Sequence, residues 1–186
     1  MKKKIIITGG LGYIGTELCK LYSGVSWHHK IIIIDNRFIS ERVNQIRNWN
    51  MEFIQGDILD KELVTKYCKD ANIVHHLAGI TTVPRTKSES SNTQDAKIKE
   101  VGEKGTQNIL DAISDKCKII FPSTHVVYEG INEVKKEIKE SEETKPVLSY
   151  STSKAINEKQ LKNSGKNYVI LRLGSVYGYS TDSMRI

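Results

Sequence analysis

Short aliphatic runs alternate along the chain with longer segments in which apolar and polar residues mix. The runs are apolar at successive positions, as in Ile31–Ile34, which is typical of strands covered on both faces of a parallel sheet. We therefore predict six strands, over 4–8, 30–34, 51–55, 73–77, 118–121 and 168–173. The intervening segments predict helices over 14–22, over 61–67, within 95–114 and over 150–163. Strands that alternate with crossover helices indicate an α/β fold, namely a Rossmann-type doubly wound parallel sheet.

Cysteine usage and the start of the chain bear on its compartment. The 186 residues, 38% hydrophobic and 27% charged, suffice for one sizeable core. Cys19, Cys68 and Cys117 are odd in number and form no CxxC pair, which argues against a disulfide framework or a zinc site. The basic start meets Thr8–Gly10 before a signal-peptide core can form, and no apolar run approaches the roughly 20 residues that cross a bilayer. We therefore expect a soluble, cytoplasmic protein with no membrane partner.

The positive charge narrows the choice of partners only slightly. The net charge is +6, but the lysines are scattered among acids and form no basic stripe with interleaved aromatic residues, so we expect no nucleic-acid partner. A mildly positive field also suits an anionic small molecule such as a nucleotide diphosphate. His75 and His76 are neighbours on a predicted strand and should point to opposite faces, so we expect no metal site there.

The first predicted strand runs into a turn with glycines three residues apart, and a helix follows at once. Gly9 permits the tight turn, Gly12 lets the backbone approach a pyrophosphate, and Gly15 lets the helix pack closely on the strand. Backbone amides and the positive end of the helix dipole would then face the phosphates. The turn therefore predicts a dinucleotide site, with Tyr13 and Ile14 among its contacts.

An acid at the end of the second predicted strand supports this interpretation. Asp35 is placed to accept hydrogen bonds from the adenosine ribose, and Asn36 beside it is a further predicted cofactor contact. A 2′-phosphate would meet the charge of the Asp35 carboxylate, so NAD is the predicted cofactor. Arg37 leaves NADP open as an alternative, because a nearby arginine can accommodate that phosphate.

The turn TGGLGYIG resembles the TGxxGxxG of short-chain dehydrogenases/reductases. It is most similar to the extended branch, the NAD-dependent epimerase/dehydratase family that includes UDP-glucose 4-epimerase. By this resemblance, Asp57 and Ile58 contact the adenine ring of the cofactor. The segment HLAG after the fourth strand resembles the family's turn beside the nicotinamide ribose. It implies cofactor contacts at Leu77, Ala78, Gly79 and Thr81.

A second group of matches concerns catalysis. Tyr150 and Lys154 form a YxxxK, whose spacing puts the phenol and the ammonium on one face of a helix. The segment from Ser123 to Tyr128 resembles the family's S-[ST]-x-x-VYG, with Glu129 where the glycine would be. The resemblance implies that Tyr150 removes a hydroxyl proton while hydride passes to the nicotinamide. It also implies that Lys154 tunes Tyr150 and holds the nicotinamide ribose, and that Thr124 binds the reacting oxygen of the substrate.

Four further positions depart from patterns of the family. The segment RLGSVYG resembles RxxNVYG, with Ser175 in place of an asparagine that faces substrate, so Ser175 is a predicted substrate contact. Gly102 stands where an NxxGT motif would have its asparagine. The dehydratases and decarboxylases of the family carry acids just after the threonine, whereas this chain has His125 and Val126, which disfavours both activities.

Taken together, the matches predict an NAD-dependent enzyme that epimerises a nucleotide diphosphate sugar, oxidising a hydroxyl and returning hydride to the opposite face. A reductase or dehydrogenase acting on such a sugar, or a non-catalytic NAD-binding module, would share the same residues. Because extended members are longer, we expect residues 1–178 to be the NAD-binding domain and 179–186 to begin a largely missing substrate-binding portion. The resemblance further implies a homodimer through the helices within 95–114 and 150–163.

Overall fold

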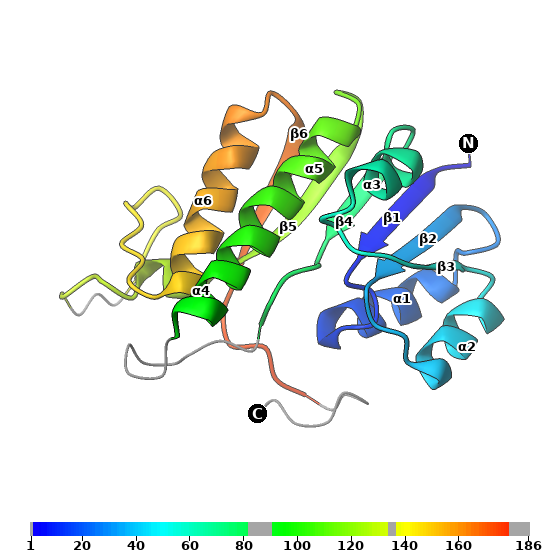
Figure 1. Ribbon diagram of the computed structural model, residues 1–186, viewed down its shortest axis with the longest axis horizontal. Coiled ribbons are helices and arrows are strands. Elements are labelled where there is room, and N and C mark those ends of the chain that lie inside the picture. Colours follow the sequence, from blue (N-terminus) through cyan, green and yellow to red (C-terminus); the bar gives the residue numbers. More distant parts are fainter. Residues whose placement is uncertain (1, 82–90, 134–136, 179–186) are drawn as a thin grey trace.

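A computed structural model describes residues 2–81, 91–133 and 137–178. Six parallel strands form one sheet in the order β3-β2-β1-β4-β5-β6 (Figure 1). The strands are β1 (Lys4–Thr8), β2 (Lys30–Asp35), β3 (Glu52–Gln55), β4 (Ile73–His76), β5 (Lys118–Thr124) and β6 (Asn167–Leu173). The chain starts in the middle of the sheet and builds outward to both edges. This is the doubly wound arrangement, and it confirms the predicted fold class.

Helices cover the sheet in two layers. They are α1 (Tyr13–Ser23), α2 (Ser40–Asn48), α3 (Lys61–Cys68), α4 (Asn92–Lys99), α5 (Gly105–Ala112) and α6 (Ser149–Asn163). The α1 and α2 helices lie on one face, and α3, α5 and α6 lie on the other (Figure 1). Within the described ranges, no helix is long and apolar enough to cross a membrane.

The isoleucine-rich strands supply both halves of the core. Successive side chains of a strand point to opposite faces of a sheet. Ile5 and Ile7 of β1 accordingly pack with α1 and α2, whereas Ile6 packs with α3 and α5. All three are at most 2% exposed. A strand buried on both faces explains why the sequence shows continuous apolar runs and no alternation.

The structure differs from the predicted elements in three places. Helix α2 was not predicted, because Val43 and Ile46 are the two apolar residues in it, and both face the core. The long helix expected within 95–114 is α4 and α5 joined by a π-helical turn, Glu100–Lys104. Strand β5 continues beyond Phe121 through Thr124, with Pro122 paired opposite Leu171 of β6.

The two adjacent histidines of β4 lie on opposite faces of the sheet, as predicted. Nε2 of His75 is 2.8 Å from the Tyr22 hydroxyl of α1. His76 lies between the hydroxyls of Thr8 and Thr106, each 3.0 Å from a ring nitrogen. Burial lowers the pKa of His75 to about 4 and that of His76 to about 3, where the Lys154 ammonium adds to the effect. Both rings are therefore neutral at physiological pH.

This burial makes stability depend on pH below neutrality. Histidines of the unfolded chain take up protons below pH ~6.5, whereas the folded rings stay neutral until about pH 4 and 3. The folded state should therefore lose stability as pH falls from ~6.5, by about 1 kcal/mol per pH unit near pH 5 for each ring. Urea unfolding between pH 5 and 7.5 measures this slope. His75→Gln should reduce it by one ring's share, and a slope unchanged in that variant would contradict the assignment. The exposed His28, changed to Gln, is the matched control.

Candidate active site

The glycine turn after β1 is shaped by the close approach of the β4 end. Gly9 has φ +69°, and a Cβ there would lie 2.7 Å from the Ala78 amide nitrogen. The Gly12 amide donates to the Gly9 carbonyl at 3.0 Å, and Gly12 is the N-cap of α1. A Cβ on Gly15 would overlap the backbone of Gly9 and Gly10. The turn is therefore tight, and the predicted contacts Leu77 and Ala78 lie against it.

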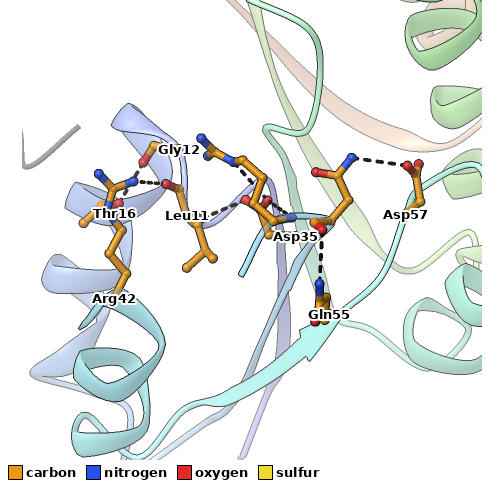
Figure 2. A network of polar contacts seen from close by, with 9 residues as sticks. Leu11, Gly12, Thr16, Asp35, Arg42, Gln55 and Asp57 are labelled. Carbon is orange, nitrogen blue, oxygen red and sulfur yellow. Dashed lines mark hydrogen bonds and ion pairs between the residues drawn. The ribbon is translucent and has the colours of Figure 1, made fainter. Parts of the chain in front are cut away.

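Asp35 ties the end of β2 to this turn (Figure 2). Its carboxylate, 5% exposed, accepts a hydrogen bond from the Leu11 amide at 2.9 Å and one from the Arg37 amide at 3.0 Å. The Arg37 Nε also lies 3.4 Å from Oδ1. An ionised carboxylate has about four acceptor positions, so capacity remains for a ribose hydroxyl.

Sequence reasoning missed Arg42, which holds the other backbone group of Leu11. Arg42 reaches from α2 and donates to the Leu11 carbonyl, while Asp35 accepts from the Leu11 amide (Figure 2). Arg42 is 6% exposed, so its guanidinium is used inside the protein. Nothing in the sequence indicated this contact, because α2, the polar helix that contains Arg42, was itself not predicted.

The loops after β2 and β3 meet beside this turn. Asn36 donates from Nδ2 to the Asp57 carboxylate at 3.2 Å, and Asp57 also accepts from the Leu59 amide at 2.9 Å. The buried Asn108 of α5 donates to the Ile58 carbonyl at 2.9 Å. Three predicted cofactor contacts, Asn36, Asp57 and Ile58, thus belong to one hydrogen-bonded group.

Helix α6 holds the YxxxK pair against the end of β5. The Lys154 Nζ donates to the Pro122 carbonyl at 2.9 Å and lies 4.4 Å from the centre of the Phe121 ring. The same nitrogen is 5.9 Å from the centre of the Tyr150 ring, so the two residues share a helix face as predicted. Burial lowers the pKa of Lys154 to about 8. Thr124, also buried, ends β5 and accepts from the Val126 amide at 3.3 Å.

One helical turn beyond Lys154, a buried carboxylate joins three elements. Glu158, 2% exposed, accepts from the Ser123 hydroxyl at 2.6 Å and from Arg172 of β6 at 2.9 and 2.6 Å. Arg172 also contacts the Tyr128 hydroxyl. Burial would raise the pKa of Glu158, but the hydrogen bonds from Arg172 and Ser123 lower it below its usual value. Its spacing of four from Lys154 was the signal that could have found it.

A pocket of about 490 Å³ opens beside this group, beyond the carboxyl ends of β5 and β6. That edge is where ligands bind in doubly wound sheets. Its lining residues are His125, Val126, Tyr128, Glu129, Ile138, Glu140 and Arg172. His125 is held there by a contact of 3.1 Å between its Nδ1 and the Leu173 carbonyl.

The chain matches the model of the NAD dependent epimerase/dehydratase family over residues 5–186. It belongs to this family. The predicted resemblance to the extended short-chain dehydrogenases/reductases is therefore confirmed, and the family is by its description NAD dependent, as predicted.

Three relatives illustrate the range of the family. The chain is 35% identical over 69% of its length to the UDP-N-acetyl-alpha-D-glucosaminuronate decarboxylase of Bacillus cytotoxicus, of which it covers 38%. It is 30% identical over 88% of its length to the UDP-glucose 4-epimerase of Neisseria meningitidis serogroup C, of which it covers 49%. The solved UDP-glucuronic acid 4-epimerase from Bacillus cereus in complex with NAD has 27% identity and a TM-score of 0.76. That match covers 94% of this chain and 57% of the other. The chain thus spans about half the length of these relatives.

One departure from the family pattern has a structural reason. A Cβ on Gly102 would overlap the Ser153 hydroxyl of α6. Asn157 of the same helix donates to the Gly102 carbonyl at 3.0 Å, which fastens the π-helical turn to α6. The close contact with Ser153 favours glycine where the family has asparagine.

Two further predicted contacts lie at the surface of the protein. They are Thr81, after β4, and Ser175, after β6, and both are exposed. The Tyr13 hydroxyl donates to the Gly178 carbonyl at 2.9 Å, which links the segment after β6 to the glycine turn. The predicted boundary segment 179–186 lies outside the described residues. Among those described, no three His, Cys, Asp or Glu side chains are grouped as metal ligands would be.

Proposed function

We propose that this chain provides the NAD-binding and catalytic part of an enzyme that epimerises the sugar of a nucleotide diphosphate sugar. The arrangement at β5 carries the proposal. Lys154 is fixed on the Pro122 carbonyl and shares a helix face with Tyr150, while Thr124 ends the same strand. A base, its cation and a hydroxyl group are thereby gathered near one sheet edge.

The described residues at the carboxyl ends of β1 and β2 fit NAD. The N-terminus of α1 follows the glycine turn, and a pyrophosphate would bind at this N-terminus. The buried Asp35 carboxylate is suited to accept from ribose hydroxyls. NAD-bound relatives such as the Bacillus cereus epimerase support the same cofactor for this chain.

The chemistry of these residues is acid–base. Tyr150 takes the proton of a sugar hydroxyl and later returns one to the carbonyl oxygen formed there. Lys154 stabilises the phenolate by its positive charge and donates to the cofactor ribose, and Thr124 donates to the reacting oxygen. NAD, when bound, would supply the acceptor and donor of the hydride at the carbon that bears this oxygen, so that the configuration of this carbon could be inverted.

Residues after Thr124 favour epimerisation over the other reactions of the family. Dehydration and decarboxylation would use acidic residues at the positions of His125 and Val126, and neither of these is an acid. His125 and Val126 follow Thr124 directly and line the pocket beyond the ends of β5 and β6. The Bacillus cytotoxicus decarboxylase is the relative against which this difference should be tested.

The test is incubation of the purified chain with NAD and UDP-, GDP- and dTDP-linked hexoses, followed by NMR of the products. Appearance of the epimer without net NADH supports the proposal. Net NADH or a keto sugar would instead identify a dehydrogenase. Binding of NAD without any change in the panel of sugars would favour a non-catalytic module.

Cofactor preference provides a sharper test of Asp35. We expect NAD to bind at least about tenfold more tightly than NADP, because the carboxylate repels a 2′-phosphate. Asp35→Asn keeps the shape and an acceptor oxygen but removes the charge, and should reduce this preference about tenfold. Calorimetric titration of both variants with both cofactors measures it. Tighter binding of NADP to the unchanged chain would mean that Arg37 decides the preference.

We also propose a cytoplasmic homodimer with no nucleic-acid partner. Three free, buried cysteines support a reducing compartment. Helices α4 and α5 both pack against α6, and they are the helices through which the resemblance implies pairing. Light scattering of the purified chain tests the dimer.

A further inference from the structure

The helix that carries Tyr150 and Lys154 begins without a cap from its own first residues. Its N-cap is Leu148, whose side chain makes no capping hydrogen bond. The first amides of a helix have no partner within the helix, so they require acceptors from elsewhere.

Glu129, in the turn after β5, holds the two residues that precede this helix and the hydroxyl of Ser151 in its first turn. Its Oε1 accepts from the amides of Val147 and Leu148, each at 2.7 Å, and from the Ser151 hydroxyl. Burial would raise the pKa of this carboxyl, but these hydrogen bonds lower it below its usual value, so Glu129 is ionised at neutral pH. A negative charge at this end of a helix is favourable in addition.

Backbone pairing makes the link between the two segments a double one. The Lys145 amide donates to the Val127 carbonyl at 2.8 Å, and the Gly130 amide donates to the Lys145 carbonyl at 2.8 Å. The segment bound in this way starts at Thr124, which caps the 3-10 turn His125–Tyr128. Glu129 therefore connects the strand end with Thr124 to the helix start with Tyr150.

We propose that Glu129 is a positioning residue that sets the Tyr150 phenol relative to Thr124 by holding the first turn of α6. The proposal rests on the proposed function for the roles of Tyr150 and Thr124. It also gives a use to the one residue in the segment after β5 that departs from the family's VYG.

Two conservative variants separate reach from charge. Glu129→Gln keeps the length and one acceptor oxygen but removes the charge, whereas Glu129→Asp keeps the charge and is one methylene too short to reach the amides. Misplacement of a reacting group by about 1 Å can cost roughly 100-fold in rate. We expect Glu129→Asp to lower turnover of the nucleotide sugar tenfold or more, with the Kd for NAD changed less than twofold. Glu129→Gln should stay within about threefold of the unchanged chain.

A second readout does not depend on turnover. With 13Cζ-labelled tyrosine, the Tyr150 resonance is the one lost in Tyr150→Phe. It should shift in Glu129→Asp and keep its position in Glu129→Gln, while Glu143→Asp, a neighbouring acid, leaves it unchanged. A purely structural role would lower the melting temperature of Glu129→Asp without moving this resonance, and would overturn the proposal. So would a Gln variant as impaired as Asp. If the unchanged chain binds no NAD, the proposed function fails, and the resonance still decides whether Glu129 positions Tyr150.

Discussion

Tyr150→Phe is expected to lower the turnover of a nucleotide sugar by roughly 100- to 10,000-fold, the range lost when a general base is removed. The variant keeps the ring, which lies 5.9 Å from the Lys154 ammonium, and removes only the hydroxyl that moves the proton. NAD affinity should change less than tenfold, because Lys154 stays on the Pro122 carbonyl and the glycine turn is untouched. Product NMR gives the rate and calorimetry gives the Kd.

Tyr168→Phe is the matched control for this substitution. Tyr168 is also a tyrosine but lies partly exposed on β6, and its loss of a hydroxyl should leave the rate unchanged. Equal rates for Tyr150→Phe and the unchanged chain would remove Tyr150 from the mechanism. An equal loss in both tyrosine variants would point to damage that is not specific to the proposed base.

Gly9→Ala is expected to destabilise the fold by about 3 kcal/mol or more. Its φ of +69° costs an alanine about 1–2 kcal/mol, and the new Cβ would also lie 2.7 Å from the Ala78 amide nitrogen. Neither β1 nor the end of β4 can give way cheaply, since Ile5, Ile6 and Ile7 pack β1 on both faces. Urea unfolding measures the free-energy difference, and NAD binding should be lost with it.

Gly165→Ala isolates the backbone part of this cost. Gly165 has the same φ of +69°, but a Cβ added there would meet no atom within 4 Å, so its substitution should cost only about 1–2 kcal/mol. A similar loss of stability in both variants would show that the approach of Ala78 adds nothing. A much larger loss for Gly9→Ala would support close packing of the turn on β4.

The sequence predicted the strands well because burial on both faces leaves a direct mark on composition. Ile31–Ile34 is a continuous apolar run, as expected of a strand covered on both faces. Five of the six strands lie within a residue or two of their expected bounds. Strand β5 extends beyond its predicted end at Phe121, because Pro122 interrupts the apolar run but still pairs with Leu171 of β6. Helix α2 was not predicted because two core-facing apolar positions are too few to show a helical period in the sequence.

At the candidate site, residue types were predictable and their partners were not. Gly9, Asp35 and the Tyr150–Lys154 pair follow from local spacing, which a single segment of sequence contains. Contacts such as Arg42 with Leu11, or Glu129 with the start of α6, join segments far apart in the chain. Nothing in the spacing of one segment reveals them, because they depend on how the sheet brings loop ends together.

The contact between Arg42 and Leu11 has a practical consequence for protein engineering. The shape of the glycine turn is not encoded by its glycines alone, since the peptides on either side of Leu11 are held by Asp35 from β2 and by Arg42 from α2. A chimera that received only residues 9–15 would acquire the glycines without their supports. The transferable cofactor module therefore extends at least from β1 through α2.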